Sequence, residues 1–213
     1  HFVLCTDTKG NIGTKNQLLF NVPLDIQRFR TLTQSPHTKA PYQHAVLMGR
    51  RTWDSLEERY RPLPNRVNVV LTRNDESARH IRAAGAYPFA CTGDAIKFLN
   101  SLSLRKIFVI GGAALYNDRW LQSKATVIHH TVVEDDVSSR YDTTHLVSVD
   151  LSFLRSFETV EEWSAPSQCT YVDECSTTKQ NRTLTFRTFQ RRSSQSSQSK
   201  KQVADSSGGE HQY

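Results

Sequence analysis

The chain alternates short runs of apolar, β-branched residues with segments in which apolar residues recur at helical spacing. We expect these runs to be buried strands, since such runs favour them. The runs are Phe2–Cys5, Ala45–Met48, Val67–Leu71, Ile107–Ile110 and Val127–Val133. Helices are expected to begin near Leu24, Arg51, Gly93 and Gly112, the first opened by Pro23, a residue favoured at the first helical position. Buried strands separated by helices favour a mostly parallel sheet.

The C-terminal part of the chain has a different pattern. Residues 183–189 alternate polar and apolar side chains, which predicts a closing antiparallel hairpin. From Arg191 onward the sequence is rich in Ser, Gln, Lys and Gly and has almost nothing to bury, so it is expected to be disordered. We therefore predict one α/β domain over residues 1–190 and a polar low-complexity tail over residues 191–213.

The composition allows one sizeable core, because 37% of the 213 residues are hydrophobic. No run is long and apolar enough to span a membrane, so we expect a soluble protein. The formal net charge of +6 suits anionic cofactors and does not by itself establish a nucleic-acid partner. The basic tail residues Arg191, Arg192, Lys200 and Lys201 offer a contact for RNA or for a protein assembly partner. A merely solubilising tail is the alternative.

The cysteines and histidines indicate neither disulfides nor a metal site. Cys5, Cys91, Cys169 and Cys175 show no CxxC spacing, so we expect free thiols in a reducing compartment. The neighbours His129 and His130 lie in a predicted strand and should face opposite ways, which leaves no metal site. The chain begins with His1 rather than Met, so we expect a removed upstream segment such as an organelle presequence. The predicted compartment is the cytoplasm or the mitochondrial matrix.

A glycine turn over residues 10–13 precedes the first predicted helix. This helix carries Asp25 in its first turn and Phe29 one turn further on the same face. A lone acid beside an aromatic wall can recognise a flat, protonatable ring. Taken alone, Asp25 is explained as well by the positive end of the helix dipole.

Arginines follow two of the predicted strands. The strand before Gly49 is followed by Arg50 and Arg51, and the next strand ends in Thr72 and Arg73. Backbone N–H groups and guanidinium groups at one sheet edge suit phosphate oxygens. Three cations there suit a 2′-phosphate, which favours NADPH over NADH, although solvated surface arginines are the simpler explanation for each alone.

Two turns complete the candidate chemistry. Gly111-Gly112 follows a buried strand and allows a ligand to approach the backbone closely, although it is not the GxGxxG fingerprint. The segment Arg61–Arg66 has the sequence RPLPNR and is predicted to be a rigid turn that aims Arg66 at a carboxylate. Each turn alone is weak support for a ligand.

Together and in this order, the motifs resemble the dihydrofolate reductase family over residues 2–190. The matching positions are Ile12-Gly13, Asp25, Phe29, Thr33, Met48–Ser55, Arg61–Arg66, Ile110–Tyr116, Thr131 and Asp142-Thr143. The stretches MGRRTWDSL and RPLPNRVNVVL are especially similar to the reductase half of the bifunctional reductase–thymidylate synthase proteins of kinetoplastid protists. This chain has no synthase half.

The resemblance implies a fold and a reaction. The fold has three layers, with a mostly parallel central sheet of about eight strands, a C-terminal antiparallel hairpin and about four helices. The reaction is the reduction of dihydrofolate to tetrahydrofolate, with NADPH as cofactor and hydride transfer from nicotinamide C4 to pterin C6. A proton reaches N5 through water.

The resemblance also implies roles for individual residues. The catalytic group is Asp25, which hydrogen-bonds the pterin, supported by Thr131, with Phe20 in the place of a family tryptophan. The implied substrate-binding residues are Cys5, Asp25, Phe29, Leu56, Leu63, Arg66 and Thr131, with Arg66 on the glutamate carboxylate. The implied cofactor-binding residues are Cys5, Ile12, Gly49, Arg50, Arg51, Thr52, Leu71, Thr72, Arg73, Ile110, Gly111, Gly112, Ala113, Ala114, Leu115, Tyr116 and Thr143.

Two departures from the family pattern keep an alternative open. Leu19-Phe20 stands where the family usually has Pro-Trp, and Phe20 cannot donate the hydrogen bond that an indole gives to water. Cys5 stands where the family generally has Ala. The alternative is a catalytically weak or inactive structural subunit of a larger, mitochondrial assembly. A reductase of the related riboflavin-pathway group is a third hypothesis, which Asp25, Phe29 and Thr33 together argue against.

Overall fold

The computed structural model describes residues 1–14, 17–35, 41–139, 141, 143–172 and 177–193. Its main sheet has nine strands in the order β4-β11-β12-β9-β1-β8-β5-β6-β7. The strands are β1 (Phe2–Thr6), β4 (Phe20–Asn21), β5 (His44–Gly49), β6 (Val67–Leu71), β7 (Tyr87–Phe89), β8 (Lys106–Gly111), β9 (Val127–Val133), β11 (Phe157–Val172) and β12 (Thr177–Arg191). All five strands predicted from apolar runs are present.

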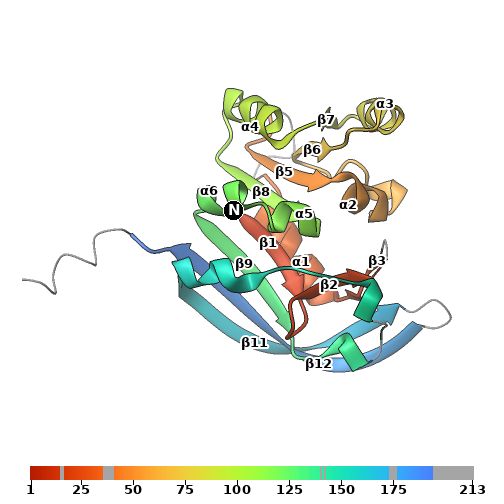
Figure 1. Cartoon of the computed structure of the whole chain (residues 1–213), viewed down its shortest axis with the longest axis vertical. Coiled ribbons are helices and arrows are strands. Elements are labelled where there is room, and N and C mark those ends of the chain that lie inside the picture. The colour runs from red at the N-terminus through yellow and green to blue at the C-terminus, as the bar shows by residue number, and fades with distance from the viewer. Residues whose placement is uncertain (15–16, 36–40, 140, 142, 173–176, 194–213) are drawn as a thin grey trace, which may run out of the picture.

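Six neighbouring strands of this sheet are parallel to one another, namely β9, β1, β8, β5, β6 and β7. The C-terminal hairpin is antiparallel. β11 pairs with β12 along its whole length, and β12 pairs antiparallel with β9. β1 lies between β8 and β9 and is parallel to both, with Cys5 opposite Thr131. Figure 1 shows this sheet running from β7 at the top to the hairpin at the bottom. The predicted mostly parallel sheet with a closing hairpin is confirmed.

A second, three-stranded sheet was not predicted. It consists of β10 (Leu146–Ser148), β2 (Asn11–Thr14) and β3 (Gln17–Leu18), in that order. Strands this short are too brief to show a period in the sequence. Short 3-10 helices occur at η1 (Glu58–Tyr60), η2 (Val137–Ser139), η3 (Thr143–His145) and η4 (Leu151–Ser156).

Four of the helices begin close to their predicted positions. These are α1 (Pro23–Thr33), α2 (Arg50–Ser55), α4 (Thr92–Ser101) and α5 (Ala113–Tyr116). Two further helices, α3 (Asp75–Ala83) and α6 (Arg119–Lys124), were not predicted. Each of them buries a single side chain, Ile81 in α3 and Leu121 in α6, so each has few apolar positions from which a helix can be predicted.

The helices cover both faces of the sheet, which gives three layers. Side chains of a strand alternate between faces, so Leu4 of β1 joins a core with α4, α5 and α6. Val3 joins a second core on the other face, built with α1, α2 and α3. The predicted three-layer fold is therefore confirmed, and α1 is held against the face that carries Val3.

A third apolar cluster fills the end of the sheet where β4 joins β11. Leu19 and Phe20 are both buried in it, and the Phe20 ring lies edge-on to Tyr171 with 6.3 Å between ring centres. Phe20 also pairs with Tyr171 in the sheet. The two residues that depart from the family pattern are thus part of the core packing at this end.

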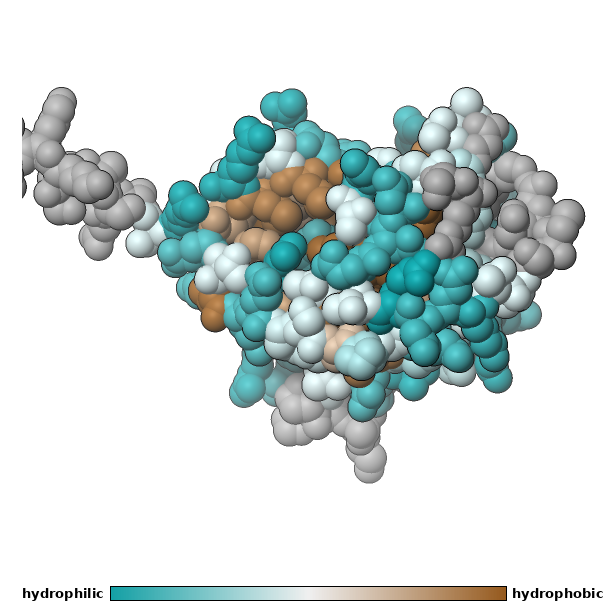
Figure 2. Space-filling model, turned by 90° about the horizontal axis from the view of Figure 1, so that it is seen from below, coloured by the Kyte–Doolittle hydropathy of each residue, from teal (hydrophilic) through white to brown (hydrophobic). Residues whose placement is uncertain are grey.

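Figure 2 shows the molecule from below, the side on which β11 and β12 lie in Figure 1. The largest apolar area on this face is bordered by hydrophilic side chains, and smaller apolar areas lie elsewhere on it. On β11, Val160 and Trp163 are 53% and 40% exposed. Apolar side chains are ordinary on protein surfaces, so this face alone identifies no partner.

The C-terminal tail predicted for residues 191–213 lies almost entirely outside the described residues. The predicted domain boundary, and the tail's RNA or protein partner, therefore stay predictions. Cys5, Cys91 and Cys169 are free thiols, and Cys175 lies outside the described residues. Within the described part of the chain, no helix is both long and apolar enough to cross a membrane.

Candidate functional site

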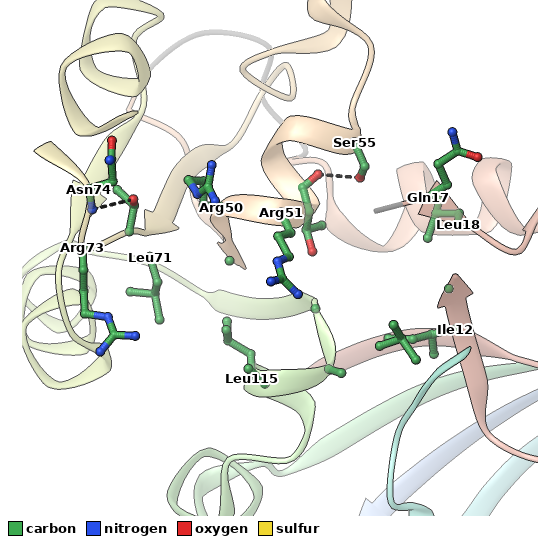
Figure 3. Close-up of a pocket in the computed structure, with 18 residues that line it drawn as sticks. Ile12, Gln17, Leu18, Arg50, Arg51, Ser55, Leu71, Arg73, Asn74 and Leu115 are labelled. Carbon is green, nitrogen blue, oxygen red and sulfur yellow. Dashed lines mark hydrogen bonds between the residues drawn. The ribbon is translucent and has the colours of Figure 1, made fainter. Parts of the chain in front are cut away.

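A cavity of about 710 Å³ opens where the parallel strands β5, β6 and β8 end. In open α/β sheets, ligands bind outside the carboxyl ends of the strands, and this volume is typical of a small-molecule site. Figure 3 shows the lining residues. Those predicted as cofactor-binding are Ile12, Gly49, Arg50, Arg51, Thr52, Leu71, Thr72, Arg73, Gly112, Ala113, Ala114 and Leu115. Residues that follow three different strands therefore converge on one cavity, as predicted.

The three predicted arginines reach this cavity in different ways. Arg51 extends from α2 toward the turn that holds Leu115, and Arg73 extends from the end of β6 (Figure 3). Arg50 is turned back along its own helix, where its Nη1 lies 3.3 Å from Asp54 Oδ2. Arg51 and Arg73 are therefore the cations best positioned for an anionic ligand.

The Gly111-Gly112 turn packs closely against α2. Gly111 has φ of +129°, a conformation that favours glycine, and a Cβ added there would lie 3.1 Å from Thr52 Oγ1. Gly49 and Gly112 are the N-caps of α2 and α5, and no side chain in the described part of the chain caps either helix. The first N–H groups of both helices therefore remain available to a ligand at the cavity.

Some predicted cofactor residues do not line this cavity. Cys5, Ile110, Gly111, Tyr116 and Thr143 are absent from its lining. Tyr116 is buried beneath it, and its hydroxyl donates a hydrogen bond to the carbonyl oxygen of Val3 at 2.6 Å. Asp142, matched as part of the family pattern, lies outside the described residues.

Other lining residues were not predicted. They are Gly13, Gln17, Leu18, Ser55, Asn74 and Val147. Asn74 follows Arg73 directly, and Ser55 lies one helical turn after Arg51, so adjacency was a usable signal for both. Gln17, Leu18 and Val147 belong to the short second sheet, and the sequence carries no signal that brings them here.

Asp25 lies on the face of the sheet covered by α1, beside Cys5 of β1 and Thr131 of β9. Cys5 and Thr131 are paired across β1 and β9, and both favour the ionised form of the Asp25 carboxyl group. Burial raises the pKa of Asp25 above its ordinary value, while the hydrogen bond from Thr131 and the charge of Arg28 oppose this shift. Burial also raises the pKa of the Cys5 thiol, so a protonated thiol faces the carboxyl group. Sequence reasoning named these three residues and missed Arg28.

Arg66 is a buried cation, with 4% of its surface exposed. Its Nη1 donates a hydrogen bond to Thr33 Oγ1 at 2.5 Å, and its Nε donates to the carbonyl oxygen of Pro64 at 3.0 Å. Burial, together with the nearby charge of Arg30, lowers the pKa of Arg66 to about 10. Over the described ranges, no carboxylate forms an ion pair with it. A buried guanidinium without an acidic partner is a candidate anion site.

Apolar residues connect Arg66 with the rest of the site. Its guanidinium lies 5.5 Å from the centre of the Phe29 ring. Phe29 and Leu56 are partly buried against the cluster that contains Leu63. Phe20 belongs to the separate cluster around Tyr171, against which Cys5 also packs, and its catalytic role stays a prediction.

Comparison with known proteins shows one family. A family model described as dihydrofolate reductase matches residues 1–191. The chain is 33% identical to a dihydrofolate reductase of Heliothis virescens over 126 residues, which cover 58% of this chain and 66% of that protein. It is 32% identical to a bifunctional dihydrofolate reductase–thymidylate synthase of Glycine max over 183 residues, 80% of this chain and 33% of that protein. A second bifunctional relative, of Arabidopsis thaliana, is 32% identical over 151 residues, 63% of this chain and 24% of that protein. The chain thus spans a third or less of these bifunctional relatives.

Proposed function

The chain belongs to the dihydrofolate reductase family, and on this basis we propose that it reduces dihydrofolate to tetrahydrofolate with NADPH as hydride donor. The observation that carries the proposal is the position of Asp25. Three separate elements, α1, β1 and β9, bring its carboxyl group together with Cys5 and Thr131. A partly buried acid with a raised pKa is the kind of group that acid–base chemistry on a pterin requires.

The cavity fits a dinucleotide phosphate. Its volume of about 710 Å³ suits such a ligand, and Arg51 and Arg73 offer cations to the 2′-phosphate. The uncapped N–H groups after Gly49 and Gly112 offer donors to the pyrophosphate. The absence of a Cβ at Gly111 lets this turn approach Thr52 closely. When bound, NADPH would supply the hydride.

We propose that Asp25 binds and orients the pterin. As a carboxylate it accepts hydrogen bonds from the amino group and the ring N–H of the substrate, and this raises the basicity of N5. Thr131 holds the carboxylate in place from β9. The protein's own contribution is therefore to position the pterin and to favour a proton at N5.

The second substrate contact is Arg66, for which we propose an ion pair with the glutamate carboxylate of dihydrofolate. Its support is the burial of the guanidinium and its hydrogen bond to Thr33. A planar guanidinium binds a carboxylate through two parallel N–H donors. Phe29, Leu56 and Leu63 are proposed to enclose the rings between the two polar ends.

The experiment that tests the proposal measures the oxidation of NADPH in the presence and absence of dihydrofolate. We expect substrate-dependent oxidation by the natural chain and a loss of about 100-fold or more in Asp25→Asn. Asp94→Asn is the matched control, because Asp94 is an exposed acid on α4 that pairs with Lys97. Both variants should keep the far-ultraviolet circular dichroism of the natural protein. A folded natural chain without this activity would contradict the proposal and favour the structural-subunit alternative.

A further inference from the structure

The guanidinium of Arg28 lies between α1 and the sheet, one turn after Asp25. Its Nη1 donates a hydrogen bond to Thr131 Oγ1 at 3.4 Å, and its Nη2 donates to Thr188 Oγ1 at 3.3 Å. The guanidinium carbon lies 5.2 Å from the centre of the Phe186 ring. These contacts join one helix and two strands, β9 and β12, to a single cation beside the candidate acid.

Thr131 connects Arg28 with Asp25. It accepts a hydrogen bond from Arg28, and Thr131 and Arg28 both lower the pKa of the Asp25 carboxyl group against the effect of burial. Residues three apart on a helix share a face, so Asp25 and Arg28 both face the sheet. A cation within a few ångströms of a carboxyl group favours the charged form, whereas burial favours the neutral form.

We propose that Arg28 is a positioning residue that keeps the Asp25 carboxyl group ionised within its buried site. Its importance for turnover rests on the proposed function, but its effect on Asp25 does not. The simpler role for Arg28 is to attach α1 to β12 through Thr188 and the carbonyl oxygen of Arg187. The two roles differ in their effect on the titration of Asp25.

The other titratable groups around the pair do not replace Arg28. Burial raises the pKa values of Cys5 on β1 and Tyr116 on α5, so both stay neutral near neutral pH. Burial lowers the pKa of His129 on β9 to about 4, so this ring is neutral too. Glu161 on β11 is an acid that attracts Arg28. Among the described residues, the cation acting on Asp25 is therefore Arg28.

The test titrates Asp25 directly by 13C NMR of its carboxyl carbon in the full-length chain, assigned with Asp25→Asn. In Arg28→Gln, which can still donate hydrogen bonds but is uncharged, we expect the Asp25 midpoint to rise by about one pH unit or more. Arg28→Lys keeps the charge and should leave the midpoint close to that of the natural chain. Arg79→Gln, which removes an exposed arginine from α3, is the control and should not change it.

An unchanged midpoint in a folded Arg28→Gln variant would overturn the inference. If that variant fails to fold, Arg28→Met makes the same comparison while keeping an apolar stem over Phe186. The NADPH oxidation assay separates this result from the proposed function. A moved midpoint in a chain that never reduces dihydrofolate refutes the proposed function alone, whereas an active chain with an unmoved midpoint refutes the role of Arg28 alone.

Discussion

Arg66 donates a hydrogen bond to the side chain of Thr33 and thereby joins the turn before β6 to the last residue of α1. Thr33 in turn donates to the carbonyl oxygen of Phe29 at 2.7 Å. The guanidinium is therefore oriented before any ligand arrives. A preorganised cation loses little entropy on binding a carboxylate.

Replacing Arg66 with Met should weaken the binding of dihydrofolate and leave the chemical step nearly intact. We expect KM to rise about tenfold or more, as for a lost charged hydrogen bond, with kcat changed much less. Steady-state kinetics at saturating NADPH would measure both constants. A dihydropterin substrate that carries no carboxylate, such as dihydrobiopterin, should bind the natural chain and the variant equally. An equal loss with both substrates would contradict the assignment.

Asp25→Asn should stabilise the protein at neutral pH while it removes activity. The folded-state pKa of Asp25 lies above its ordinary value of 3.8, so stability falls as the pH rises through the folded-state pKa. Asn lacks this titration. The variant should therefore have a higher free energy of unfolding than the natural chain at neutral pH. This difference should vanish at a pH below the ordinary pKa of Asp. Urea unfolding at the two pH values would measure it. If the variant is no more stable than the natural chain at neutral pH, burial does not destabilise the ionised form of Asp25.

Arg73→Gln should weaken the use of NADPH more than that of NADH. Arg73 reaches the cavity edge, where we propose that the 2′-phosphate binds, and a charge-assisted contact to phosphate is among the stronger hydrogen bonds. We expect KM for NADPH to rise about tenfold, and KM for NADH to stay unchanged. Arg79→Gln on the exposed side of α3 is the matched control. Similar losses for both cofactors would place the 2′-phosphate elsewhere.

The buried histidines of β9 should make the fold sensitive to acid. Burial lowers the pKa of His129 to about 4 and that of His130 to about 3, against 6.5 for the ordinary side chain. Below pH 6.5 the unfolded chain binds protons that the folded chain does not, so the free energy of unfolding falls as the pH falls. Each histidine contributes up to about 1.4 kcal/mol per pH unit in this window.

Urea unfolding between neutral pH and about pH 5 would measure this slope. His130→Asn, which keeps a polar side chain near the Thr6 hydroxyl that lies 3.0 Å from His130 Nε2, should have a shallower slope than the natural chain. His80→Asn, on the exposed surface of α3, should not change it. Equal slopes in all three proteins would mean that the buried ring is protonated without cost.

The strands and the sheet edge could be predicted because their signals are local. The strands at Val67–Leu71 and Val127–Val133 match their predicted bounds, since apolar runs end where burial ends. The meeting of Arg51 and Arg73 followed from their positions after parallel strands. Neither required knowledge of distant contacts.

The role of Arg28 could not be predicted in the same way. Its spacing from Asp25 is visible in the sequence, but an arginine on an amphipathic helix usually faces solvent. Its partners Phe186 and Thr188 lie on β12, more than a hundred residues away. Only the docking of the last strand beside β9 shows that this cation is inside.

β12 is the last strand of the sheet in the chain, yet it lies inside the sheet between β9 and β11. A growing polypeptide that has not yet released β12 from the ribosome leaves one edge of β9 open along its length. Every side chain of β9 after Val127 is buried in the finished sheet, including Ile128, Val132 and Val133. The unfinished strand therefore exposes apolar side chains and backbone groups that are open to pairing with other chains. The fold therefore completes only after translation has passed residue 190, and chains that terminate early are expected to aggregate.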